Sequence, residues 1–143
     1  MKTLALILAL TVAGTLHAQE TALDFGWIDV YVDSGAKKLA AYQVDLSAAT
    51  GNVMIVGISG GEHPAFSKEP YYDKAAMRHD HVILAAFNTG NDLPTGRTRV
   101  ARIMVSYRKG VHPTYRFTLT TAATVGGEKI PAVVSIQTGG AAE

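Results

Sequence analysis

Apolar side chains beyond residue 20 recur at every second position, and turn-forming residues interrupt them at short intervals. The segment 39–47 shows the pattern, with Ala40, Tyr42, Val44 and Leu46 on one side of the chain. A period of two is the repeat of a β-strand with one buried face. Several such strands separated by frequent turns predict an all-β fold, an antiparallel β-sandwich.

Seven segments follow this pattern, and we expect about seven to nine strands in all. They are 27–33, 39–47, 53–58, 81–87, 98–107, 115–121 and 130–137. In the segment 98–107, alternation places Arg102, Met104 and Ser106 on the outward side. Between the third and fourth segments, residues 60–80 contain glycines and prolines with little alternation, which predicts a long excursion from the sandwich.

The first 18 residues have the features of a secretory signal peptide, because Lys2 is followed by an apolar run and a small residue, Ala18. This run is shorter than the ~20 residues of a membrane-spanning helix, which makes a membrane anchor the weaker alternative. We therefore predict a signal peptide at 1–18, a sandwich domain at 19–138 and a flexible tail at 139–143. The mature chain is expected to be secreted, periplasmic or extracellular, without a membrane span.

Charge and cysteine content narrow the function classes. The chain has 13 basic and 12 acidic residues and no cysteine. Removal of residues 1–18 takes away one lysine and no acid, so the mature formal charge is 12 − 12 = 0. A neutral domain lacks the strong positive field that nucleic-acid binding requires, so no nucleic-acid partner is expected. A disulfide-based scaffold is excluded.

Motifs of nucleophilic catalysis are missing from the sequence. There is no cysteine nucleophile and no Gly-x-Ser-x-Gly turn, and Ser59, followed by His63 four residues on, comes closest. No helix is predicted after Ser59, although a nucleophile elbow requires one. We therefore expect a protein that is not an enzyme.

A metal site is the main alternative to this expectation. His79 and His81 are two residues apart, so on a strand both would point to the same side, and His63 or Asp73 could supply a third ligand. These ligands would suit a zinc ion that activates a bound water molecule. The oxygen-rich segment 88–92 would suit a loose calcium site, although its residues are also ordinary turn formers. No cofactor is expected, with Ca²⁺ or Zn²⁺ as the alternatives.

Two histidines each precede a proline: His63 in Glu-His-Pro and His112 in Val-His-Pro. Loops of this kind could lie together at one end of the sandwich. A residue before proline is also pushed to extended geometry, so a purely structural role explains both segments more simply.

With the strand order in place, residues 26–137 resemble a cohesin-type domain, a sandwich related to several carbohydrate-binding modules. The segments that carry the resemblance are 41–46, 53–58 followed by Gly60-Gly61, 82–87, 93–96 with 100–105, and 127–131. Segments 39–43 and 92–101 are also similar to uncharacterised secreted bacterial proteins that carry such a domain. The resemblance implies a sandwich fold with a binding or scaffold role.

The sequence thus predicts a secreted, non-enzymatic binding or scaffold module that contacts another extracellular protein. Its contact surface is expected at the outward residues of the long strand, Arg102, Met104 and Ser106. Carbohydrate binding is the second hypothesis, because flat aromatic rings serve as stacking platforms. The rings proposed for a polysaccharide are Trp27, Tyr71 and Tyr72. The third hypothesis is a metal-dependent enzyme built on the histidines named above.

Overall fold

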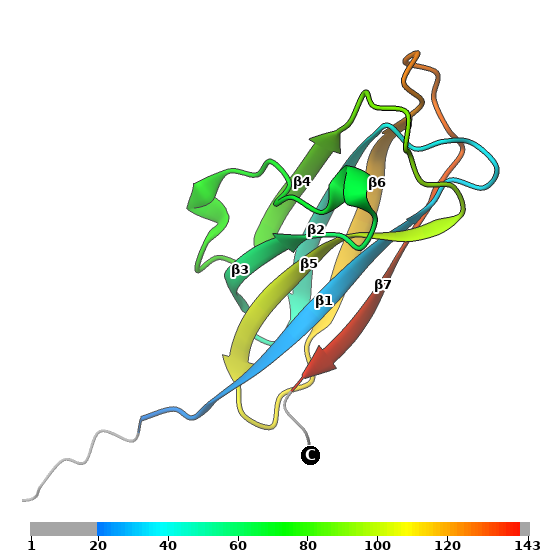
Figure 1. The fold of residues 1–143 in the computed structure, drawn as a ribbon. Coiled ribbons are helices and arrows are strands. Elements are labelled where there is room, and N and C mark those ends of the chain that lie inside the picture. Colours follow the sequence, from blue (N-terminus) through cyan, green and yellow to red (C-terminus); the bar gives the residue numbers. More distant parts are fainter. Residues whose placement is uncertain (1–19, 141–143) are drawn as a thin grey trace, which may run out of the picture.

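A computed structural model of the chain describes residues 20–140, which form two antiparallel sheets packed face to face (Figure 1). The predicted signal peptide at 1–18 and residues 141–143 of the predicted tail lie outside the described residues. Within the described part of the chain, no helix is long and apolar enough to cross a membrane.

Each of the seven predicted segments overlaps a strand, although the last strand begins at Val133 and not at residue 130. The strands are β1 (Leu23–Asp33), β2 (Ala41–Thr50), β3 (Met54–Gly60), β4 (His81–Phe87), β5 (Arg97–Arg108), β6 (Thr114–Ala123) and β7 (Val133–Gly140). One sheet has the order β3-β5-β1-β7 and the other β4-β2-β6, so each connection along the chain crosses from one sheet to the other. Two 3-10 turns, η1 (Pro64–Phe66) and η2 (Lys74–Ala76), lie in the excursion between β3 and β4.

The core lies between the sheets and is built from the inward positions that the alternation predicted. Tyr42, Val44 and Leu46 of β2 are at most 2% exposed, and they pack with inward residues of the facing sheet such as Ile28 and Ile103. The Tyr42 hydroxyl donates to the carbonyl oxygen of Val100, 3.2 Å away, which satisfies a polar group in the core. Burial raises the pKa of the Tyr42 phenol well above its usual range.

Bulges change which face is buried within two strands. In β5 the pairing with β1 shifts by one residue at Val100, and Val100 and Ala101 are both fully buried. In β6 the pairing with β2 shifts at Thr120. Strict alternation from Tyr115 would place Thr121 on the inward side, but Thr121 is exposed and Ala122 is buried instead. A bulge inserts one unpaired residue, after which every later side chain changes face.

Ser106 lies on the outer side of β5, as the alternation predicts, but it is only 2% exposed. Ser106 lies opposite Phe25 of β1 and Met54 of β3, and directly opposed residues share a face of the sheet. A small side chain between two large neighbours is covered by them. Gly139 and Gly140, the first two residues of the predicted tail, pair with Trp27 and Gly26 of β1.

The excursion between β3 and β4 covers one edge of each sheet. Tyr71 exchanges two backbone hydrogen bonds with Ala85 of β4. Ile55 of β3 donates to the His79 carbonyl and accepts from the Arg78 amide. Unpaired strand edges are prone to pairing with other chains, so this long segment protects both edges.

Candidate functional site

Large hydrophobic side chains gather on the outer face of the four-stranded sheet. We call this group the apolar face, and its members are Phe25, Trp27, Met54, Val56 and Met104. Phe25 is 60% exposed, and the next three are 40%, 39% and 46% exposed. Four of the five residues, all except Met54, line a shallow hollow of about 500 Å³. Exposed patches of this kind mark interaction sites more often than chance.

The local structure explains why these side chains point outward. On β1, Ile28 and its alternate neighbours fill the core, which leaves Phe25 and Trp27 on the opposite side. On β3, the pairing with β5 shifts between Ile55 and Gly57, so Val56 is the extra, exposed residue of a bulge.

A charged network borders the apolar face. Asp29, whose side chain is 9% exposed, accepts hydrogen bonds from the Nε and Nη2 atoms of Arg102 at 2.6 and 2.8 Å. Arg99 lies 3.6 Å from the same carboxylate. The Arg102 hydrogen bonds, with the charges of both arginines, hold the pKa of Asp29 below its usual range against the opposing effect of burial. Arg102 also lies 5.6 Å from the centre of the Trp27 ring.

Positive charge predominates on this outer face. By the alternation of β5 and β1, it carries four arginines and two aspartates, a net charge of 4 − 2 = +2. They are Arg97, Arg99, Arg102 and Arg108, with Asp29 and Asp33. The predicted contact residues Arg102 and Met104 therefore lie on this surface, but Ser106 does not reach it.

The three aromatic rings proposed for carbohydrate stacking do not share one surface. Trp27 lies on β1 of the four-stranded sheet, whereas Tyr71 bridges to β4 of the other sheet and stacks on Phe87 at 6.1 Å. Tyr72 is half-buried against the core, and its hydroxyl accepts a 2.8 Å hydrogen bond from Lys74.

The proposed metal ligands are held in separate interactions. The His63 Nδ1 atom accepts from the Ala65 amide, and its Nε2 atom lies 3.6 Å from Asp92. The His81 Nε2 atom lies 2.8 Å from Asp45. Among residues 20–140, no three His, Cys, Asp or Glu side chains gather into a group that could hold a metal ion.

His79 and Asp73 also differ from the expected arrangement. His79 precedes β4 and is not on the strand with His81, because Arg78 adopts a positive φ of 66° that interrupts the extended chain. Asp73 accepts from the Ala75 amide and caps η2. In the proposed calcium segment, Asn88 accepts from the Gly90 amide, so this side chain already closes a turn.

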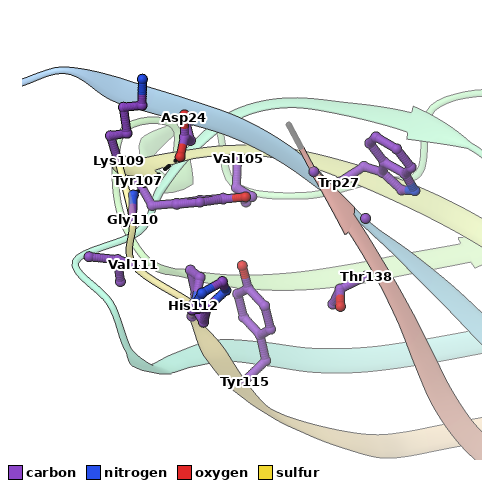
Figure 2. A pocket seen from close by; sticks show the side chains of 13 residues that line it. Asp24, Trp27, Val105, Tyr107, Lys109, Gly110, Val111, His112, Tyr115 and Thr138 are labelled. Atoms are coloured by element: carbon purple, nitrogen blue, oxygen red, sulfur yellow. Dashed lines mark hydrogen bonds between the residues drawn. The ribbon is translucent and has the colours of Figure 1, made fainter. Parts of the chain in front are cut away.

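A pocket of about 690 Å³ opens at the end of the sandwich where the loop 109–113 joins β5 to β6 (Figure 2). We call it the tyrosine pocket, and define it by Tyr107, His112, Tyr115 and Thr138. The first tyrosine comes from β5, the second from β6, and Thr138 from β7. In Figure 2 the Tyr115 hydroxyl is directed towards Tyr107, whereas the Lys109 amine and the Trp27 indole point away.

Two glycines make room for the Tyr107 ring. Gly26 and Gly140 are paired residues of β1 and β7, and a Cβ atom at Gly26 would lie 3.0 Å from the Tyr107 hydroxyl. A Cβ atom at Gly140 would approach the same oxygen to 2.5 Å. Side chains at these positions would push the phenol away, so the glycines determine the position of one wall of the pocket.

Hydrogen-bonding groups in the tyrosine pocket are not used by the surrounding protein. The hydrogen bonds found within residues 20–140 do not involve the hydroxyls of Tyr107, Tyr115 and Thr138 or the ring of His112. Burial, with a smaller contribution from nearby Tyr107, raises the pKa of the Tyr115 phenol to about 12. This phenol therefore keeps its proton at neutral pH and is able to donate.

Sequence reasoning did not identify this pocket. Tyr107 and Tyr115 occupy inward positions of their strands, where an aromatic residue is indistinguishable from core. The His-Pro segment at His112 was the available signal, but the alternative in which its loop lies beside the His63 loop is wrong. The Glu62 amide, next to His63, donates to the Arg99 carbonyl near the start of β5. The Lys109 amide, in the loop that contains His112, follows the other end of β5 and donates to the Ala22 carbonyl.

The tyrosine pocket and the apolar face are thus two surfaces that the geometry of residues 20–140 offers for binding. A smaller hollow of about 410 Å³ is lined by Asp73, His79 and His81, three of the proposed metal ligands. Comparisons with known proteins leave the chain without an assigned family: no family model matches it, and no curated protein or solved structure shows significant similarity to it.

Proposed function

We propose that the domain is a non-enzymatic binding module that contacts another protein through the apolar face. The observation that carries the proposal is the composition of this surface. Phe25, Trp27 and Met104 line one hollow, and the guanidinium of Arg102 lies 5.6 Å from the centre of the Trp27 ring. Aromatic residues, methionine and arginine are the types enriched at protein interfaces. The secreted location predicted from residues 1–18 would make the partner an extracellular protein.

Charge defines the chemistry of this partner. The net charge of +2 on the outer face favours an acidic surface that carries apolar residues to fill the hollow between Phe25 and Val56. Trp27 is the expected centre of the interface, because tryptophans and arginines that a partner buries contribute a large share of the binding energy.

Variants on the two outer faces test the proposal. Immobilised protein is exposed to the exported proteins of the source cells, and the partner retained is identified and titrated by calorimetry. Met104→Glu introduces an acidic group into the apolar face, whereas Thr118→Glu introduces the same charge on exposed β6 of the other sheet. We expect M104E to weaken binding at least tenfold and T118E to leave the dissociation constant unchanged.

The dependence of the dissociation constant on salt provides a second measurement. We expect the dissociation constant to rise with ionic strength, because salt screens the attraction between an arginine-bearing face and an acidic partner. Equal binding by M104E and T118E would contradict the proposal, and so would failure to retain any protein.

The other hypotheses have less support from the geometry. Carbohydrate binding by Trp27, Tyr71 and Tyr72 would require rings on one surface, and these rings belong to different sheets and a loop. A metal-dependent enzyme would require ligands that converge, and two of the proposed ligands, His63 and His81, contact separate carboxylates. The resemblance to cohesin-type domains accords with a protein partner and stays a prediction.

A further inference from the structure

The tyrosine pocket is a second surface with unused binding capacity. It adjoins the hollow of the apolar face, and the two share the lining residues Asp24, Trp27, Val105 and Gly140. Its four defining side chains come from β5, β6, β7 and the loop before β6, which meet at one end of the sandwich. Its volume of about 690 Å³ lies within the ~300–1,000 Å³ of small-molecule sites.

The polar groups of the pocket share one chemical property. The hydroxyls of Tyr107, Tyr115 and Thr138 each donate and accept hydrogen bonds, and neutral His112 offers one donor and one acceptor. A ligand that satisfies all four must itself carry several groups that both donate and accept. Hydroxyl groups are the common ligand groups with this property.

Aromatic rings supply the apolar part of the pocket. The rings of Tyr107 and Tyr115 form two of its walls. Val105 of β5 also lines the pocket. Aromatic ring faces pack well against the C–H groups on one side of a saturated ring, while hydroxyl groups at its edges are free to form hydrogen bonds.

Formal charge in the pocket disfavours an anionic ligand. Asp24 lies at the rim, where it accepts from the Gly110 amide at 3.3 Å, and its carboxylate would repel an anion. The Lys109 amine, which would attract an anion, points away in Figure 2. We infer that the tyrosine pocket binds a neutral sugar residue.

Saturation-transfer NMR with three probes tests this inference: methyl β-glucoside, methyl β-galactoside and N-acetylglucosamine, each at about 10 mM. We expect transfer to at least one of these sugars and chemical-shift changes at the Tyr115 and His112 rings. Tyr115→Phe removes only a hydroxyl and is expected to weaken that sugar about tenfold, the effect of one lost hydrogen bond.

The matched control is Tyr71→Phe, the same change on a tyrosine that is 69% exposed at the β4 edge. It should leave the dissociation constant unchanged. His112→Ala is a second pocket variant, and a cooperative urea transition confirms that each variant is folded. Oligosaccharides of the bound sugar distinguish the source, because tighter binding than the monosaccharide indicates a polysaccharide chain and equal binding indicates a single residue.

Absence of transfer to all three sugars would overturn the inference, and so would equal losses in Y115F and Y71F. Met104→Glu separates this site from the proposed protein contact. Sugar binding that survives M104E supports a separate pocket, whereas loss of sugar binding in folded M104E would place the ligand on the apolar face and contradict it.

Discussion

Asp29 shows at the scale of one residue how a buried charge is kept on an exposed sheet. A buried carboxylate is stable only when it is paired, and Arg102 supplies two hydrogen bonds in a bidentate arrangement. Arg102 and Arg99 retain 39% and 21% of their side-chain exposure, so water solvates the guanidinium groups that surround the buried acid.

We predict that Asp29→Asn lowers the free energy of unfolding by about 1.5–3 kcal/mol at pH 7, the contribution of a hydrogen bond to a charged group. Urea denaturation measures the change. Glu128→Gln is the control, because the side chains of its ion pair with Lys37 are 64% and 47% exposed. Exposed ion pairs contribute little, so E128Q should change stability by less than about 0.5 kcal/mol.

The effect of Asp29→Asn should depend on pH. Arg102 lowers the folded-state pKa of Asp29 below the value of about 3.9 in an unfolded chain. The stabilisation is therefore complete above that value and is lost as the pH falls through the folded-state pKa. The difference between the urea transitions of wild type and D29N should narrow as the pH falls below the unfolded-state pKa of about 3.9. A constant difference from pH 7 to pH 2 would contradict the pairing.

Gly139 determines the position of the only tryptophan of the chain. A Cβ atom at this residue of β7 would overlap the Cζ2 and Cε2 atoms of the Trp27 indole, so the ring lies directly over the glycine. Close contact of an aromatic ring with a cross-strand glycine is a recognised way of covering exposed backbone.

Gly139→Ala is expected to move the indole off the sheet, shift its fluorescence emission to longer wavelength and destabilise the fold by about 1–3 kcal/mol, as overpacking does. Gly126→Ala is the control, because its nearest neighbouring atom is 3.9 Å from the added Cβ. An unchanged emission spectrum in G139A would show that Trp27 does not rest on β7.

At the scale of elements, the bulge at Val100 changes which alternate residues of β5 face the core. Before the bulge, Thr98 and Val100 point into the core, and after it Ala101, Ile103 and Val105 do so. The outward side of β5 consequently presents Arg102 beside Asp29 of β1.

Deletion of Val100 should abolish the cooperative urea transition. Without the extra residue, one half of β5 would direct its apolar side chains to solvent, since a shift by one residue exchanges the two faces. Deletion of Thr89, an exposed residue in the loop after β4, should retain a cooperative transition. A folded protein lacking Val100 would show that the bulge is dispensable.

At the scale of the whole molecule, the two candidate surfaces follow from the alternation of strands between sheets. Because each connection crosses the sandwich, β1, β5 and β7 assemble in one sheet although they lie far apart in sequence (Figure 1). The apolar face lies on the outside of this sheet, and the tyrosine pocket lies at the end where β5, β6 and β7 meet.

The sequence by itself determined the all-β class and the positions of all seven strands, because alternation and turn residues are local properties of the chain. Most inward residues followed for the same reason, as in Tyr42 and Val44 of β2. It also indicated Arg102 and Met104 as outward residues of the long strand.

Only the tertiary structure decided where bulges change the buried face, as at Val100 and Thr120, because a bulge is defined by pairing with another strand. It likewise decided that Ser106 is covered by its cross-strand neighbours and that His63 meets Asp92 instead of His79. The tyrosine pocket depends on contacts between β5, β6 and β7, and no local pattern records which distant strands will meet.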